Sequence, residues 1–194
     1  MHFKCGDQLV LFNDETERIY QLDQVEQPHS VHLKLVAEQD RQLPQKHIYL
    51  LWALQDNYED IINKSTELGC TNFIPIVADK CDKTSFEINR AKIDIIEATE
   101  KSGRAEIPNI REPISVDEAM AEYADLPLFI CEAGEDKPDF SGQDKVGLLV
   151  EPSAGWSDRE QKLISDTHLQ RISIIGPGIK PEISALMGIS KLLQ

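Results

Sequence analysis

Apolar and polar residues alternate over the first part of the chain. Val31–Glu38 (VHLKLVAE) has the period of two that is typical of a half-buried strand. Gln8–Asn13 and Arg18–Val25 are similar short runs that flank a turn-like polar segment. The polar stretch Gln39–Lys46 that follows is interpreted as a linker. We therefore predict a small β domain over residues 1–46.

From His47 onwards the pattern changes to apolar runs that alternate with segments of helical spacing. The predicted strands are His47–Leu54, Asn72–Ala78, Leu126–Glu132, Lys145–Glu151 and Arg171–Gly176. The predicted helices span 56–69 and 87–102, begin near 115 and 157, and close the chain over 181–194. Such alternation indicates an α/β domain over residues 47–194, with a largely parallel sheet covered by helices on both faces.

Several predicted helices begin at residues suited to a helix N-terminus. Ser115–Glu118 and Ser157–Glu160 both have the S-x-x-E pattern of a capping box. Asp56 or Asn57 is expected to cap the first helix through its side chain. Pro181 stands at the first turn of the last helix, where its missing N–H costs little.

Composition indicates a soluble, cytoplasmic protein. No apolar run reaches the roughly 18 residues of a membrane span, and the N-terminus lacks a secretory pattern. The four scattered cysteines are expected to be reduced thiols, and the five histidines lack metal-ligand spacing, so we expect no metal and no membrane partner. The net charge of −14 opposes the approach of RNA, so any RNA contact needs a local basic patch.

Candidate chemistry is concentrated where three of the predicted strands end. Ligands of open α/β sheets bind outside the carboxyl ends of the strands. The segments that follow Phe129, Leu149 and Ile175 are such ends, and glycine and proline dominate two of them. Exposed main-chain groups there could recognise an adenine edge. Ordinary tight turns explain the same pattern equally well, and no P-loop is present.

Two side chains outside these turns are also candidates. Arg104 follows Ser102 and Gly103 at the end of a predicted helix, where a guanidinium could bind a phosphate or a carboxylate. It could equally be a cation that complements the dipole of the helix. Cys131 ends a predicted strand, and a buried structural thiol is favoured over a nucleophile.

Four segments of the chain resemble a known family in their sequence, their order and their spacing. They are KSTELGCTNFIPIVADKC (64–81), IIEATEKSGRAEIPNI (95–110), VGLLVEPSAGWSDREQKLI (146–164) and ISIIGPGIKPEISALMGISKLLQ (172–194). Together they resemble the ribosomal RNA small subunit methyltransferase E family. The resemblance implies a SPOUT-type α/β fold with a C-terminal trefoil knot, a homodimer and a preceding PUA-like β domain. That β domain is expected to be truncated here.

The resemblance also implies an activity and a site. Members methylate N3 of a uridine in 16S rRNA of the small ribosomal subunit, with S-adenosyl-L-methionine as cofactor. The cofactor is held largely by main-chain groups, and the implied binding residues are Cys131, Glu132, Leu149, Glu151, Gly155, Ile175, Gly176, Pro177, Ile179 and Ser184. Arg104 and Lys180 are implied substrate contacts. No catalytic residue is identified.

Departures from the family pattern leave alternatives open. Glu151 stands where the family has a glycine, and Gly178 and Pro181 stand where it has arginines. Losing a positioned arginine would cost about 3 kcal/mol of transition-state stabilisation. A catalytically weakened relative that binds RNA or assists ribosome assembly is therefore the alternative function. An unrelated nucleotide-binding α/β protein is a third hypothesis.

Overall fold

The computed structural model divides the chain into two compact units, Met1–Leu43 and Pro44–Gln194. The structure describes residues 4–12, 16–26, 30–40, 43–81, 85–133, 140, 142–167, 169–174 and 178–194. Within this part of the chain, no helix has the length and apolar character that crossing a membrane requires.

The smaller unit is a three-stranded antiparallel sheet. Its strands are β1 (Gln8–Phe12), β2 (Thr16–Glu26) and β3 (Ser30–Asp40), in the order β1-β2-β3. The predicted strands are therefore confirmed. β3 is longer than expected, because its pairing with β2 continues through Gln39 and Asp40, the first residues of the expected linker.

Both faces of this small sheet are largely exposed. Leu9, Tyr20 and Leu35 are aligned across the three strands and so share one face. Leu35 is 48% exposed, and Leu22 is the one apolar residue that is fully buried among the described residues of the unit. The unit therefore has little core of its own.

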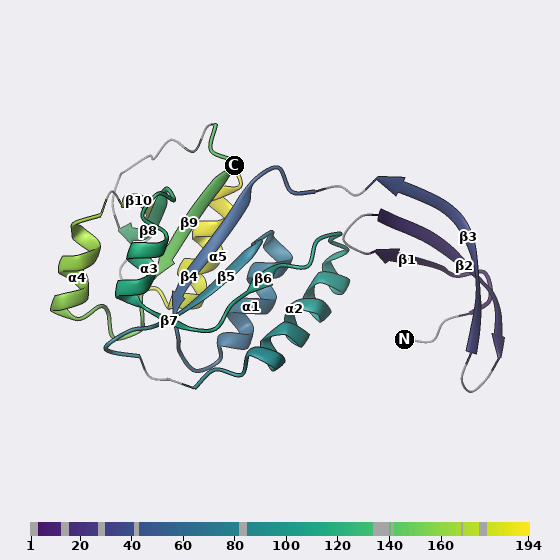
Figure 1. The fold of residues 1–194 in the computed structure, drawn as a ribbon, viewed down its shortest axis with the longest axis horizontal. Coiled ribbons are helices and arrows are strands. Elements are labelled where there is room, and N and C mark those ends of the chain that lie inside the picture. Colours follow the sequence, from purple (N-terminus) through teal and green to yellow (C-terminus); the bar gives the residue numbers. More distant parts are fainter. Residues whose placement is uncertain are drawn as a thin grey trace. The chain divides into compact units, whose positions relative to one another are not determined.

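The larger unit is built on a seven-stranded sheet in which every pair of strands is parallel (Figure 1). Its strands are β4 (His47–Ala53), β5 (Asn72–Val77), β6 (Asn109–Ile110), β7 (Ile114–Ser115), β8 (Leu128–Ala133), β9 (Lys145–Val150) and β10 (Gln170–Ile174). The order is β10-β8-β9-β4-β5-β6, with β7 also paired to β5. This confirms the prediction of an α/β fold with a mostly parallel sheet.

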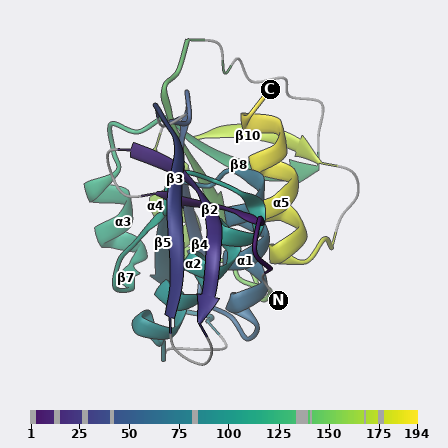
Figure 2. The same cartoon turned by 90° about the vertical axis from the view of Figure 1, so that its right-hand side faces the viewer.

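Among the described residues, five helices cover the two faces of the sheet. They are α1 (Tyr58–Leu68), α2 (Ile88–Ser102), α3 (Val116–Glu122), α4 (Asp158–Ser165) and α5 (Pro181–Leu192). Buried residues of α1, α2 and α5 form one core cluster, and those of α3 and α4 form a second. Figure 2 shows α3 and α5 on opposite sides of the sheet.

The central strand β4 supplies both cores. Leu50 and Trp52 point into the cluster beneath α1, α2 and α5, whereas Leu51 and Ala53 point into the other. All four are at most 1% exposed. A strand that is buried on both faces reads as a continuous apolar run, which is why HIYLLWA shows no alternation.

Helix α5 packs very closely on the sheet. A Cβ added at Gly188 would lie 2.5 Å from Cδ2 of Leu148 and 2.9 Å from Sγ of Cys131. Glycine therefore permits the approach of α5 to β8 and β9.

The helix starts match the sequence in part. Ser115 and Ser157 both form complete capping boxes, and Pro181 begins α5, as predicted. The expected side-chain cap of α1 is wrong. Asn57 occupies the N-cap position in a left-handed conformation, with φ 62°, and its side chain makes no capping hydrogen bond.

Candidate functional site

The segment between β9 and α4, residues 151–157, is called here the β9 loop. Pro152 and Trp156 are buried and fix its two ends, whereas Ser153 and Ala154 are exposed at its tip. The N–H of Gly155 donates to the carbonyl of Pro152 at 2.8 Å, and Gly155 has a φ of +70°, which favours glycine. The result is a tight turn of small residues at the carboxyl edge of the sheet.

The β9 loop is held against the carboxyl end of β5. Glu160, in the first turn of α4, is fully buried. Its Oε2 accepts from the N–H of Ser157 at 2.9 Å, and its Oε1 accepts from the N–H of Asp79 at 2.7 Å. Nζ of Lys80 donates to the carbonyl of Trp156 at 3.0 Å. Asp79 and Lys80, the second and third residues after β5, therefore contact the end of the loop directly.

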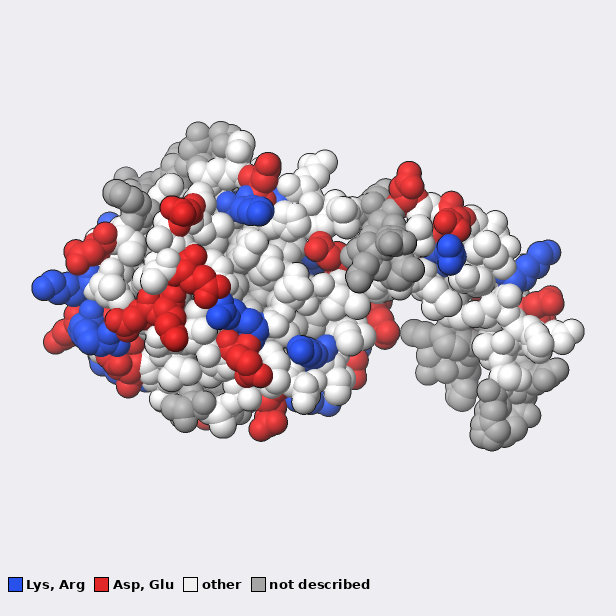
Figure 3. Space-filling view, in the orientation of Figure 1, with Lys and Arg blue, Asp and Glu red and all other residues white. Residues whose placement is uncertain are grey.

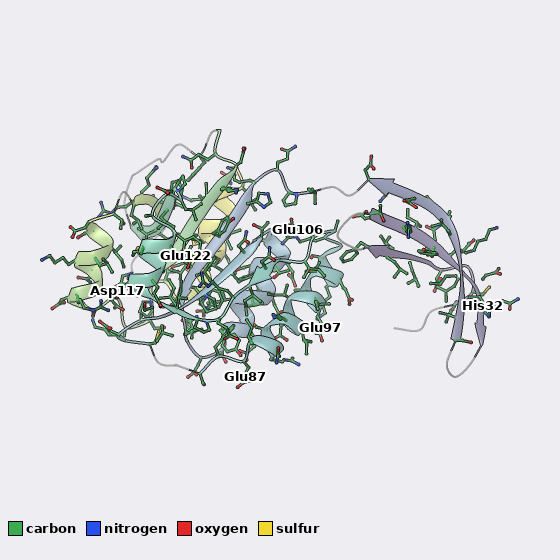
Figure 4. All side chains as sticks on the ribbon, in the orientation of Figure 1. His32, Glu87, Glu97, Glu106, Asp117 and Glu122 are labelled. Carbon is green, nitrogen blue, oxygen red and sulfur yellow. The ribbon has the colours of Figure 1, made fainter. Side chains whose placement is uncertain are left out.

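A charged network surrounds this contact. Arg159 donates through Nη1 to Asp117 at 2.6 Å and through Nη2 to Asp79 at 3.2 Å. Hydrogen bonds from Arg159 and then from Ser157 hold the pKa of Asp79 below its ordinary value. Asp117, labelled in Figure 4, lies on α3. These side chains are well exposed, so the ion pairs contribute little stability on their own.

The end of β8 lies beside the start of α5. Sγ of Cys131 donates to the carbonyl of Ser184 at 3.4 Å, so two of the expected cofactor-binding residues are brought together. Burial raises the pKa of Cys131 to about 11, which keeps the thiol protonated and unreactive. Nζ of Lys191 donates to the carbonyl of Ser173, which ties α5 to β10 as well.

The segment from Ile175 to Lys180 is called here the β10 loop. Ile175, Gly176 and Pro177 lie outside the described residues, and of Glu132 in β8 only the backbone is described. Ile179 is half-buried, and the side chain of Lys180, the N-cap residue of α5, is 79% exposed. Its Nζ lies 3.9 Å from Oε1 of Glu182. Lys180 is therefore available to contact a ligand or RNA.

The main chain at Gly155 and at Gly178 borders open space. A Cβ built at Gly155 or at Gly178 would have no heavy atom within 4 Å. Glu151 is exposed at the start of the β9 loop, and Leu149 is fully buried within β9 beneath it. Nε1 of Trp156 is buried without a hydrogen-bond partner among the described residues. Small exposed turns of this kind fit a cofactor that is recognised by main-chain N–H and C=O groups.

Arg104 lies outside the sheet, in the segment between α2 and β6. Its Nη1 donates to the carbonyls of Thr66 at 2.6 Å and Cys70 at 2.8 Å, at the C-terminal end of α1. Thr66 lies in the last turn of α1 and Cys70 lies two residues before β5, so both carbonyls are at the amino edge of the sheet. The β9 loop follows the carboxyl end of its strand. Within one chain, therefore, Arg104 is not brought together with the other expected site residues.

The amino edge also contains a cavity of about 450 Å³. It is bordered by the segments that lead into β8, β9 and β10, and Asp125, Gln143 and Asp166 are among its polar residues. Since none of the expected site residues line it, this cavity is separate from the candidate site.

The residues that hold the β9 loop from outside could not be identified from the sequence. Gln55, after β4, has its Oε1 3.5 Å from Oγ of Ser153, and Asp79 and Lys80 follow β5. No motif marks these three positions. The capping-box pattern does identify Glu160, the partner of Asp79. That pattern gives no information on the bond between Glu160 and Asp79, which lie 81 positions apart in the sequence.

Comparison with known proteins places the chain among RNA-modifying enzymes. A family model described as an RNA methyltransferase domain matches residues 41–179. The ribosomal RNA small subunit methyltransferase E of Rickettsia conorii is 25% identical, in an alignment that covers 99% of this chain and 82% of the relative. The enzyme of the same name from Aquifex aeolicus is 22% identical over 87% of this chain and 78% of its own.

Solved structures share the fold. A methyltransferase of Legionella pneumophila in complex with S-adenosylmethionine has a TM-score of 0.80 and 24% identity, with 98% of this chain and 84% of the other covered. A ribosomal RNA small subunit methyltransferase E of Neisseria gonorrhoeae bound to S-adenosylmethionine has a TM-score of 0.83 and 21% identity, with 96% and 82% covered.

Proposed function

Because the chain belongs to the family of RNA methyltransferase domains, we propose that it transfers a methyl group from S-adenosylmethionine to ribosomal RNA of the small subunit. N3 of a uridine in 16S rRNA is the proposed acceptor. The observation that carries the proposal is the family match over residues 41–179, which includes the β9 loop and most of the β10 loop. The similarity to the Rickettsia conorii enzyme over 99% of the chain supports the choice of substrate.

The proposal extends to the architecture. We infer a SPOUT-type arrangement in which the C-terminal strands and α5 form a trefoil knot, with the smaller unit as a PUA-like domain. A cytoplasmic homodimer is the inferred working form. The similarity to the solved structures over 96–98% of the chain supports the inferred fold.

The proposed cofactor site is the carboxyl edge formed by β8, the β9 loop and the β10 loop. The cofactor, when bound, supplies a methyl group on a positively charged sulfur. The main chain around Gly155 and Gly178 would hold the adenosine part, because it borders open space. The carboxylate of Glu151 would add negative charge beside the sulfonium and so favour binding.

The acceptor atom must lose a proton before it can take the methyl group. Uracil N3 becomes nucleophilic as its proton passes to water, and negative charge then develops on the neighbouring carbonyl oxygens. A positioned cation stabilises such charge. Lys180 is the exposed cation at the start of α5 and would serve this role.

The distribution of charge limits where RNA can approach. The net charge is −14, and acidic residues of α3 gather on the face of the larger unit seen in Figure 3. Asp117 and Glu122 are labelled on this helix in Figure 4. This face would repel RNA, so we expect RNA to approach the unit on another side.

A direct test uses small ribosomal subunits from cells that lack the corresponding modification. Incubation with methyl-labelled S-adenosylmethionine should place label in 16S rRNA, and nucleoside analysis should identify 3-methyluridine. Lys180→Met should reduce the rate by about 100-fold if Lys180 stabilises the developing charge. The proposal is contradicted if the folded protein binds the cofactor but labels no RNA in these particles.

A further inference from the structure

The capping boxes of α3 and α4 have the same sequence pattern but different contacts. In the box of α3, one oxygen of Glu118, Oε2, accepts from both the N–H and the hydroxyl of Ser115, each at 2.8 Å, in an exposed setting. In the box of α4, the carboxylate of Glu160 is fully buried and is divided between two partners. Its Oε2 binds Ser157, and its Oε1 binds the N–H of Asp79. Glu160 therefore does more than cap its helix.

Burial of a carboxylate is costly unless its oxygens receive hydrogen bonds. A capping box by itself needs no burial, as Glu118 shows. The additional bond to Asp79 joins the start of α4 to the end of β5, two segments that are far apart in sequence. The conformation at the end of the β9 loop is therefore fixed by an element outside the loop.

A second bond acts at the same place. Nζ of Lys80 donates to the carbonyl of Trp156 at 3.0 Å. Trp156 is 4% exposed and packs with the core beneath α3 and α4. Its main chain is thus held by Lys80 on one side and by its own buried ring on the other. The exposed tip of the loop, Ser153 and Ala154, is only two residues away.

We propose that Glu160 and Lys80 are positioning residues for S-adenosylmethionine, because they hold the main chain of the β9 loop in the shape that accepts the cofactor. This inference rests on the proposed function. Recognition through main-chain groups depends on the backbone being fixed before the ligand arrives, since ordering it on binding would reduce affinity. The side chains themselves need not touch the cofactor.

The first test compares Glu160→Gln with the matched variant Glu118→Gln. This substitution keeps the size of the side chain but replaces one carboxylate oxygen by an NH₂ group. An NH₂ group cannot accept from a backbone N–H, so one of the two hydrogen bonds to Ser157 and Asp79 is lost. By isothermal titration of the full chain, we expect E160Q to bind S-adenosylmethionine about tenfold more weakly than the wild type. E118Q, which loses only a cap, should bind within about twofold of the wild type.

Hydrogen exchange separates positioning from a general loss of stability. E160Q should speed amide exchange at Ser153–Ser157, while exchange in the core strand β4 stays unchanged. E118Q should leave exchange in the β9 loop unchanged. Equal exchange in the loop of E160Q and the wild type would contradict the inference.

The second test avoids the core altogether. Lys80→Met removes the bond to the carbonyl of Trp156, and its matched control is Lys64→Met, which breaks an exposed pair with Asp60 within α1. We expect K80M to weaken cofactor binding about threefold to tenfold and K64M to leave it unchanged. If E160Q fails to fold, K80M alone still tests whether a fixed β9 loop is needed for cofactor binding.

The outcomes distinguish the two proposals. If the wild type binds no S-adenosylmethionine, the proposed function fails and the inference fails with it. If the wild type binds the cofactor and E160Q and K80M bind it equally well, the inference alone is wrong. Weaker binding in both variants, with normal binding in both controls, supports it.

Discussion

Replacing Arg104 by methionine tests whether this residue supports the fold. Its Nη1 donates to the carbonyls of Thr66 and Cys70, 2.6 and 2.8 Å away, and joins the end of α2 to the end of α1. Burial lowers the pKa of the guanidinium, as expected for a cation held against the protein. Methionine keeps much of the aliphatic stem but leaves both carbonyls without this donor.

The expected cost follows from the two bonds. A hydrogen bond to a charged group contributes about 1.5–3 kcal/mol, and Arg104 is only partly buried, so the lower end applies to each. Arg104→Met should therefore lower the free energy of unfolding by about 3 kcal/mol. A suitable control is Lys101→Met at the same end of α2. The side chain of Lys101 is 70% exposed, and its ion pair with Glu97 is long, at 3.6 Å, and therefore weak. That variant should lose at most about 0.5 kcal/mol.

Urea unfolding followed by tryptophan fluorescence measures both variants, since Trp52 and Trp156 are buried in the larger unit. A loss below about 1 kcal/mol in R104M would refute the structural role. In that case Arg104 would be free to contact substrate, as the family resemblance implies.

Three further predictions concern packing and titration. Gly188→Ala should destabilise the protein by about 1–3 kcal/mol in urea unfolding, because the added Cβ would lie 2.5 Å from Cδ2 of Leu148; a stability equal to the wild type would contradict the close packing of α5. Cys70 and Cys131 should resist Ellman's reagent at about pH 8 until urea unfolds the chain, since burial raises their pKa values to about 12 and about 11; rapid reaction of either thiol in the folded protein would be inconsistent with this. Burial also raises the pKa of Asp94, so the folded state binds its proton more tightly than the unfolded state and stability falls as pH rises through the raised pKa. Asp94→Asn should remove this dependence when unfolding free energies are compared from about pH 4 to about pH 8, and parallel profiles would show that Asp94 does not contribute.

Much of the fold could be predicted because its signals are local. The S-x-x-E pattern identified both capping boxes, and the apolar run of β4 identified a strand buried on both faces. The start of α1 could not be predicted, because Asn57 adopts a left-handed conformation and its side chain makes no capping bond. A propensity for capping does not specify which backbone conformation the residue takes.

The site was predicted less fully because its contacts are long-range. Sequence indicated which turns carry small residues, and the structure places Cys131 beside Ser184. The bonds from Asp79 to Glu160 and from Lys80 to Trp156 join residues more than 70 positions apart, and no local pattern encodes them. Arg104 could be noticed in the sequence, but its motif fitted either a ligand contact or a cation at a helix end. Only the fold shows that its guanidinium binds the carbonyls of Thr66 and Cys70.

Amide hydrogen exchange of the full chain, with and without S-adenosylmethionine, tests the central claim most directly. If the carboxyl edge binds the cofactor, exchange should slow on cofactor addition in residues 131–133, 151–157 and 178–184, and should not change around the amino-edge cavity at Asp125 and Asp166. Protection at that cavity, or no protection in the β9 loop despite measurable binding, would contradict the assignment of the carboxyl edge as the cofactor site.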